Sequence, residues 1–168
     1  MQYAWTCGCC GKQFSTLPEG WMYKAPDAWV AIPAAERESR GKCDADLCHI
    51  KGTGFFVRGC LEVPIIGSDQ RYIWGVWAMV AEDRFWRILD LWSAPDAESE
   101  PPIAGRLANA IKIYPPLLDL PASLRLRSNN QRPAIMLEAA EHPLALEQRH
   151  GIAIERVLEI TAALSPHH

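Results

Sequence analysis

The middle of the chain alternates between apolar and polar positions with a period of two residues. In residues 55–66 the odd-numbered positions are apolar or glycine, whereas Arg58 and Glu62 fall on the even-numbered face. This alternation is typical of a half-buried β-strand. Residues 67–69 form a turn sequence, and residues 71–80 are rich in aromatic and β-branched side chains. The pattern therefore predicts a β-hairpin.

Four other segments show the spacing or the boundary signals of helices. A proline in the first turn and a glycine at the exit predict a short helix over residues 33–41 and a longer one over residues 143–151. Residues 82–92 begin with two acidic side chains and continue with an apolar stripe at helical spacing. Apolar positions from residue 154 onward predict the second member of a C-terminal helical pair.

Shorter signals complete the expected fold. Further strands are expected at residues 106–113, 123–127 and 134–138, and an exposed acidic loop at residues 93–102. We therefore predict an α+β fold with a central, mostly antiparallel β-sheet, packed helices and an N-terminal segment resembling a zinc knuckle. A length of 168 residues suits one domain. Within it we expect a cysteine-containing segment, residues 1–50, as a zinc-binding appendage to an α+β body, residues 51–168.

The charge and hydropathy of the chain argue against nucleic acid and membranes as partners. The net charge is −3, the isoelectric point is near 5.9, and the basic residues are scattered. Nucleic-acid binding is disfavoured, because it needs concentrated Lys and Arg. No targeting segment and no apolar run of membrane-spanning length is visible. We expect a reducing cytoplasm, in which the six cysteines are thiols or metal ligands.

The strongest local motif is Cys7-x-x-Cys10, followed directly by Gly11. Two thiolates at this spacing can bind one ion when a glycine turn directs backbone amides toward the sulfurs. A closed structural zinc site needs four ligands. The motif therefore predicts half of such a site.

The remaining ligands must come from elsewhere in the chain. We expect Cys43 and Cys48, with His49 and Cys9 as alternates. The alternative of metal-free thiols stays open, because the spacing of Cys43 and Cys48 is looser than that of a second knuckle. A thioredoxin-like redox pair is disfavoured, because irregular, proline-containing sequence follows the motif.

A second group of residues suggests weak catalytic candidates. Arg58 and Glu62 share one strand face with Cys60 between them, and His142 precedes a helix start. In a cleft, Arg58 would bind an anion and Glu62 or His142 would act as a base. The alternative is an ordinary ion pair and a histidine that caps the helix.

Seven tryptophans are many for this length. Four of them, Trp74, Trp77, Trp86 and Trp92, fall in the predicted hairpin and the helix that follows it. Such residues are mostly core, but any that is exposed would favour protein binding, since Trp anchors interfaces. Phosphate loops, nucleophile elbows and common metalloprotease motifs are absent from the sequence.

Motifs along nearly the whole chain resemble one family. They are Cys-x-Cys-Cys-Gly near the start, Leu17-Pro18, residues 56–64, residues 74–77, Gly105-Arg106-Leu107, Tyr114-Pro115, Arg132-Pro133 and residues 142–152. Together they resemble an uncharacterised bacterial family, domain of unknown function 2199. The resemblance implies a histidine shortly after Cys-Cys-Gly, where this chain has Phe14, and it marks Cys48 as a third ligand.

These observations give one preferred function and two alternatives. We expect a non-enzymatic module that binds another protein, either an adaptor or a toxin-neutralising immunity-type protein, with a structural zinc site. The first alternative is a small enzyme with a polar cleft formed by Arg58, Glu62 and His142. The second is a zinc-ribbon nucleic-acid binder, which the low isoelectric point disfavours.

Overall fold

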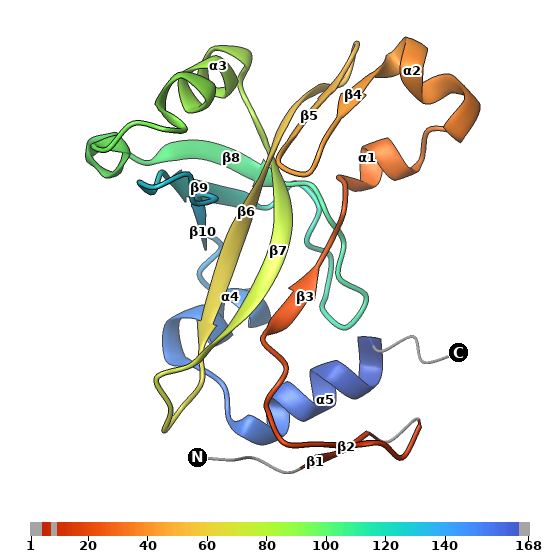
Figure 1. Ribbon diagram of the computed structural model, residues 1–168, viewed down its shortest axis with the longest axis vertical. Coiled ribbons are helices and arrows are strands. Elements are labelled where there is room, and N and C mark those ends of the chain that lie inside the picture. The colour runs from red at the N-terminus through yellow and green to blue at the C-terminus, as the bar shows by residue number, and fades with distance from the viewer. Residues whose placement is uncertain (1–4, 8–9, 165–168) are drawn as a thin grey trace.

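A long β-hairpin is the central element of the fold. The computed structural model describes residues 5–7 and 10–164 (Figure 1). Strands β6 (Gly54–Pro64) and β7 (Arg71–Val80) pair along their whole length, from Phe55 opposite Val80 to Pro64 opposite Arg71. The β-hairpin predicted from the sequence is therefore confirmed.

Three short strands join this hairpin into a closed cycle of pairings. Strands β8 (Ile103–Leu107), β9 (Pro121–Arg125) and β10 (Ala134–Leu137) follow β7 in antiparallel order. β10 then returns to β6 in a parallel pairing, with Ala134 opposite Cys60. Because direction alternates along four antiparallel pairings, the fifth strand must run parallel to the first. The cycle thus needs one parallel contact to close.

The remaining strands extend the sheet or stand apart from it. The eight-stranded order is β3-β7-β8-β9-β10-β6-β5-β4, in which β3 is Gly20–Met22, β4 is Gly41–Cys43 and β5 is Leu47–Ile50. β3 runs parallel to β7, whereas β4 and β5 form an antiparallel hairpin beside β6. β1 (Trp5–Thr6) and β2 (Gln13–Phe14) form a separate two-stranded ribbon.

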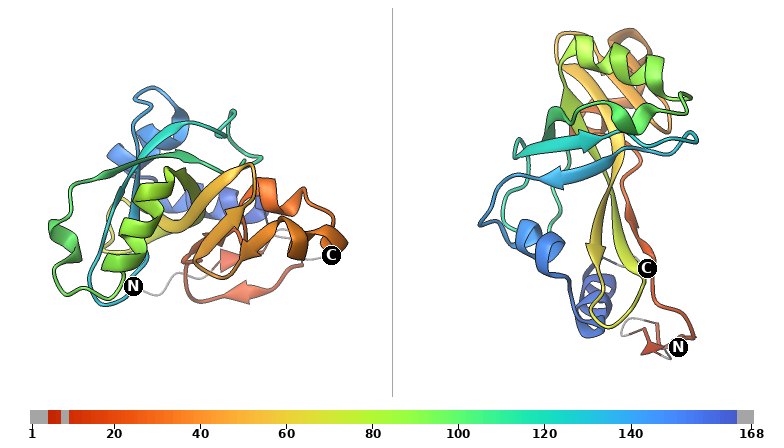
Figure 2. Two further views of the ribbon diagram at one scale, coloured as in Figure 1. Left: turned by 90° about the horizontal axis from the view of Figure 1, so that it is seen from above. Right: turned by 90° about the vertical axis from the view of Figure 1, so that its left-hand side faces the viewer.

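Helices flank the sheet at its two ends (Figures 1 and 2). α3 (Glu82–Leu91) lies near the β4–β5 hairpin, while α4 (Pro143–His150) and α5 (Ile154–Leu164) lie toward the opposite end. The short elements are α1 (Asp27–Val30), η1 (Ala34–Glu36), α2 (Arg37–Arg40) and η2 (Ala97–Ser99). None of the helices in the described part of the chain has the length and apolar character needed to cross a membrane.

Two apolar clusters hold these elements together. The larger cluster includes Leu61 and Trp74 of the hairpin, Ile88 of α3 and Val157 of α5, all fully buried. The smaller cluster consists of Ile32, Cys48, Ile50, Phe56, Trp77 and Ala108. Both faces of β6 are therefore used: one contributes to the main core and the other to the smaller cluster.

The predicted α+β class, the mostly antiparallel sheet and the C-terminal helical pair are confirmed. Two segments differ from expectation. Residues 93–102 are not a simple exposed loop, because they contain η2, bury Ala97 and bind Arg87 of α3 through Glu100 at 2.9 Å. β8 ends at Leu107, earlier than predicted, because the next residues leave the sheet as an irregular segment.

Candidate functional site

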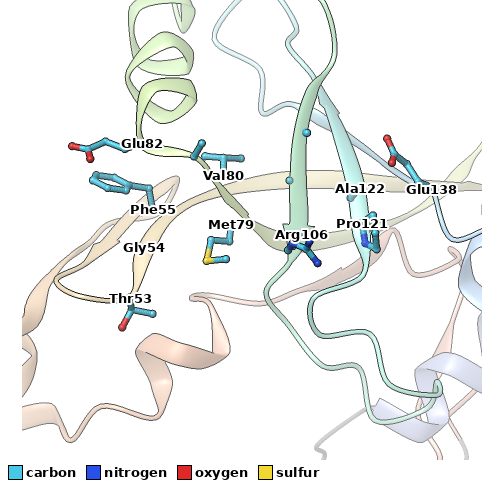
Figure 3. A pocket seen from close by; sticks show the side chains of 13 residues that line it. Thr53, Gly54, Phe55, Met79, Val80, Glu82, Arg106, Pro121, Ala122 and Glu138 are labelled. Carbon is cyan, nitrogen blue, oxygen red and sulfur yellow. The ribbon is translucent and has the colours of Figure 1, made fainter.

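A groove of about 480 Å³ lies where the β6–β7 hairpin meets β8 and β9. Figure 3 shows Phe55 and Glu82 at one end of this groove, Glu138 at the other and Arg106 between them. The Arg106 guanidinium donates to the backbone oxygen of Asp119 at 3.2 Å and forms no salt bridge within the described chain. The groove thus combines apolar walls with one cation and two carboxylates.

An aromatic cluster borders the groove on the side of α3. The ring of His49 stacks on Phe55 with centroids 4.3 Å apart, and Phe55 lies 5.0 Å from Phe85. The indole of Trp86 meets both phenylalanines edge-on, at 6.1 Å from Phe55 and 5.2 Å from Phe85. Phe85 is buried, but Trp86 remains 50% exposed. The cluster holds this tryptophan in place while leaving half of its surface open.

The exposed side of α3 continues this apolar surface. Leu89, one turn after Trp86, is 38% exposed. Glu82, Asp83 and Asp90 are exposed on the same helix. We define the α3 face as Trp86, Leu89 and these three carboxylates.

The sequence predicted only part of this region. Trp86 was among the tryptophans considered as anchors, and the structure separates it from Trp74 and Trp77, which are fully buried. The sequence did not predict that Phe55 and Arg106 line a groove. Phe55 lies on a strand face that packs against a helix, and the sequence alone does not show whether such a side chain is exposed.

The predicted knuckle residues Cys7 and Cys10 lie in the turn between β1 and β2. The amide of Cys7 donates to the oxygen of Lys12 at 2.8 Å, and the amide of Gly11 donates to the oxygen of Cys7 at 2.9 Å. Gly11 has φ of +69°, which favours glycine. Cys7 is buried and Cys10 is exposed. Cys9, the alternate ligand, lies outside the described residues.

Phe14 occupies the position at which the family resemblance implies a histidine. Its ring stacks on Trp5, with centroids 4.6 Å apart and an interplanar angle of 18°. The position therefore contributes a ring contact across the β1–β2 ribbon. It offers no nitrogen to a metal.

Cys43 and Cys48 lie directly opposite each other on β4 and β5. The Cys43 thiol donates to the backbone oxygen of Asp44 at 3.8 Å. Burial raises the pKa of both thiols, and the neighbouring Cys43 raises the pKa of Cys48 further. Both groups therefore favour the neutral thiol over the metal-binding thiolate. His49 faces away from this pair, in the stack on Phe55.

The structure does not bring these four cysteines into one group. The β1–β2 ribbon and the β4–β5 hairpin lie at opposite ends of the molecule in two perpendicular views (Figures 1 and 2). Among residues 5–7 and 10–164, no cluster of three or more His, Cys, Asp or Glu side chains is arranged to hold a metal ion. The structure thus separates the thiols into one pair at each end.

Arg58 is buried on the face of β6 that the β4–β5 turn covers. Its Nη1 donates to the oxygen of Ala45 at 3.2 Å, and its buried Nε has no hydrogen-bond partner among the described residues. Burial lowers the pKa of this guanidinium, and the nearby Arg132 lowers it further. Arg132 itself pairs with Asp46 at 2.7 Å.

Glu62 and His142 are bound by other groups. Glu62 pairs with Arg127 at 3.1 Å and with Arg71 at 3.4 Å. Nδ1 of His142 accepts from the amide of Leu144 and caps α4. No described hydrogen bond or ion pair joins Arg58, Glu62 and His142 to one another. The structure therefore does not assemble them into a shared polar centre.

A partly buried polar network that the sequence did not single out ties the helical pair to the loop after β8. The Tyr114 hydroxyl donates to Glu147 of α4, and Arg156 of α5 binds the same carboxylate at 2.9 Å. The Arg156 guanidinium also lies over the Tyr114 ring, 5.6 Å from its centroid. Burial and the bond to Glu147 raise the pKa of Tyr114. Residues this far apart in sequence carry no local signal of their pairing.

Comparison with known proteins yields one match. The model of a family described as an uncharacterised protein conserved in bacteria (DUF2199) matches residues 6–152. Neither the curated proteins nor the solved structures gave a significant match. The matched segment runs from the end of β1 to just beyond α4 and therefore contains the groove, the aromatic cluster and both pairs of cysteines. The chain belongs to this family of uncharacterised bacterial proteins, DUF2199.

Proposed function

We propose that this protein is a non-enzymatic module that binds another protein through the α3 face. The observation that supports the proposal is the exposure of Trp86. An indole that is held by two phenylalanines and still half exposed presents a rigid apolar surface to solvent. Trp is enriched among residues that dominate binding energy at protein interfaces.

Pre-organisation makes this tryptophan suited to binding. Phe55 and Phe85 already restrict its side chain, so that little conformational entropy is lost when a partner covers it. Truncating a central interfacial tryptophan costs about 2 kcal/mol or more. The Trp86→Ala variant is therefore expected to bind its partner about 30-fold more weakly.

The charges around Trp86 indicate the character of the partner surface. Glu82, Asp83 and Asp90 are exposed on the same helix; Asp83 pairs with Arg84 at 3.7 Å and Arg87 pairs with Glu100, so that Glu82 and Asp90 carry the net negative charge. A basic rim around an apolar pocket would complement this arrangement. Both an adaptor and a toxin-neutralising immunity-type protein fit this description. We therefore expect the association rate to fall as salt is added.

Site-specific photo-crosslinking in a native bacterial lysate tests the proposal. A photoreactive phenylalanine analogue at position 86 is compared with the same residue at position 146. Leu146 is a matched control, because it is 41% exposed on α4 at the other end of the molecule. We expect one discrete crosslinked protein from position 86 and none from position 146.

The isolated partner then decides between the two kinds of module. Trp86→Ala should weaken its binding about 30-fold while Leu146→Ala leaves binding unchanged. If the partner is a toxin, a stoichiometric amount of the protein should abolish its activity; an adaptor should leave it active. Equal affinity of wild type and Trp86→Ala, with both folded, would reject the proposed face.

A structural zinc at the β1–β2 turn is a second part of the proposal. Cys7 and Cys10 offer two thiolates at the required spacing, and the Gly11 turn resembles that of a knuckle. Two further ligands are needed, and Cys9 is the nearest candidate in sequence. Elemental analysis of untagged protein should give one zinc per chain. The metal should be lost in Cys10→Ser and kept in Cys43→Ser; loss in both variants would favour the four-cysteine site predicted from the sequence, and absence of zinc from the wild type would end this part of the proposal.

A further inference from the structure

The positions of Cys43 and Cys48 in the β4–β5 hairpin bring their thiols together. The two residues are directly opposite in the antiparallel register. The next pair toward the turn is hydrogen-bonded, since the amide of Asp44 donates to the oxygen of Leu47 at 2.9 Å. Because hydrogen-bonded and non-hydrogen-bonded pairs alternate, Cys43 and Cys48 occupy a non-hydrogen-bonded position. At such positions opposite Cα atoms are only about 4.5 Å apart.

This spacing falls within the range that a disulfide requires. Disulfide-bonded cysteines have Cα atoms about 4.4–6.8 Å apart. The side chains also point to the same face, because residues directly opposite each other in an antiparallel pair do so. A covalent bond between the two sulfurs would therefore need only a small adjustment of the hairpin.

The two thiols differ in their access to solvent. Cys48 is 1% exposed and belongs to the smaller apolar cluster, whereas Cys43 is partly exposed at the outer strand of the sheet. An oxidant from solvent can thus reach Cys43 but not Cys48. This asymmetry sets the order in which the two sulfurs react.

We propose that Cys43 and Cys48 form an oxidisable dithiol that closes to an intramolecular disulfide when the protein meets a low-molecular-weight disulfide. The exposed Cys43 thiol first loses its proton and then attacks one sulfur of that oxidant; a mixed disulfide forms, and one thiol leaves with a proton. The Cys48 thiol in turn loses its proton, attacks the Cys43 sulfur and expels the second thiol. Two protein thiols are oxidised, and the oxidant disulfide is reduced to two thiols that take up the two protons.

The location of the pair gives this chemistry a structural consequence. The disulfide closes a ring over the four residues 44–47, and so short a loop contributes little to stability through chain entropy. We therefore expect a change of thiol state with little change in Tm. The neighbouring His49 stacks on Phe55 of the aromatic cluster. The dithiol therefore lies close to the proposed partner-binding surface.

Peptide mapping of the native protein gives a direct test. Trypsin cleaves after Lys42 and Lys51, so that Cys43 and Cys48 fall in one peptide, residues 43–51. The full-length protein is dialysed against a chelator, incubated with oxidised glutathione, alkylated and digested without reduction. In most molecules this peptide should carry no alkyl group and should be two hydrogens lighter than the free dithiol peptide. Treatment with dithiothreitol should restore both thiols.

Cys60 provides an internal control within the same protein. It lies on β6 opposite Gly75 rather than opposite a second cysteine, and its peptide contains no other cysteine. This peptide should stay alkylated or carry glutathione, without an intramolecular bond. In Cys48→Ala, Cys43 should stop at the glutathione adduct, with circular dichroism showing that the variant is folded. A wild-type 43–51 peptide that stays doubly alkylated, or that is bonded to a different cysteine, would overturn the proposal.

Discussion

The closure of the strand cycle depends on the absence of a side chain at Gly59. A Cβ atom there would lie 2.6 Å from two side-chain atoms of Ile135 and 2.8 Å from the backbone oxygen of Pro133. That oxygen accepts the amide of Cys60 at 2.8 Å beside the parallel contact between β6 and β10. Gly59→Ala therefore forces β10 away from β6 at the contact that closes the cycle.

The cost of this substitution follows from two terms. Overpacking a core position typically costs 1–3 kcal/mol, so we take about 2 kcal/mol. Lengthening the bond between Cys60 and Pro133 adds about 1 kcal/mol, and the gain of alanine over glycine in a strand offsets about 0.5 kcal/mol. We expect the free energy of unfolding to fall by about 2.5 kcal/mol. In urea this corresponds to a midpoint lowered by about 1 M.

A second substitution relieves part of the side-chain contact and none of the backbone contact. Ile135→Val removes Cδ1, one of the two side-chain atoms 2.6 Å from the new Cβ, but leaves Cγ1 and the oxygen of Pro133 in place. The double variant should recover about 1 kcal/mol relative to Gly59→Ala and no more. A Gly59→Ala protein within 0.5 kcal/mol of wild type, or complete rescue by Ile135→Val, would show that the backbone contact does not limit closure.

Three further predictions follow from buried polar groups and from the α3 face. Asn109→Ala should destabilise the fold by about 3 kcal/mol in urea unfolding, because the buried Trp77 amide would lose its acceptor at 2.7 Å. The raised pKa of Tyr114 keeps its phenol neutral in the fold, so the stability it contributes is fully present below pH about 10 and is lost as the pH rises above that value. Tyr114→Phe should therefore lose the bond to Glu147, about 1 kcal/mol at pH 7, and show a shallower loss of stability above pH 10; an unchanged slope would contradict this assignment. Trp86→Ala should change Tm by only a few degrees in a thermal melt, because half of the side chain is exposed; a large drop would mean that this tryptophan serves the core.

The sequence predicted those elements whose signals are long and local. The alternation in residues 55–66 and the aromatic and β-branched side chains of residues 71–80 predicted the β6–β7 hairpin, and the apolar stripe of residues 82–92 predicted α3. The capping residues Pro143 and Gly151 bounded α4 correctly. The signals of the hairpin and of α3 succeed because each extends over about ten residues.

The β4–β5 hairpin had no comparable signal. Its strands have three and four residues, too few for a period of two to stand out. The turn between them is held by Asp44, whose side chain accepts from the amides of Asp46 and Leu47 at 2.8 Å. Because this hairpin was not predicted, only the spacing of Cys43 and Cys48 in the sequence could be used. Their direct pairing across two strands was not predicted.

The candidate site depended on exposure and on contacts distant in sequence. Trp77 lies in an apolar strand segment and Trp86 lies among charged residues of a helix, and one is fully buried while the other is half exposed. The difference arises because Trp77 packs under the smaller cluster and donates to the oxygen of Tyr23 at 2.9 Å. Such a partner more than fifty positions away cannot be inferred from the spacing of one segment.

The short strands at the two ends of the sheet order limit how this protein can recognise a partner. β3 and β4 have three residues each, while the long strands β6 and β7 lie inside the order and pair with each other along their whole length. A foreign strand could therefore dock on only a few free amides and carbonyls, which disfavours both recruitment by strand addition and growth into amyloid-like stacks. Side chains on the helices and turns can accordingly change to give new binding specificity without creating a sheet edge that is prone to aggregation.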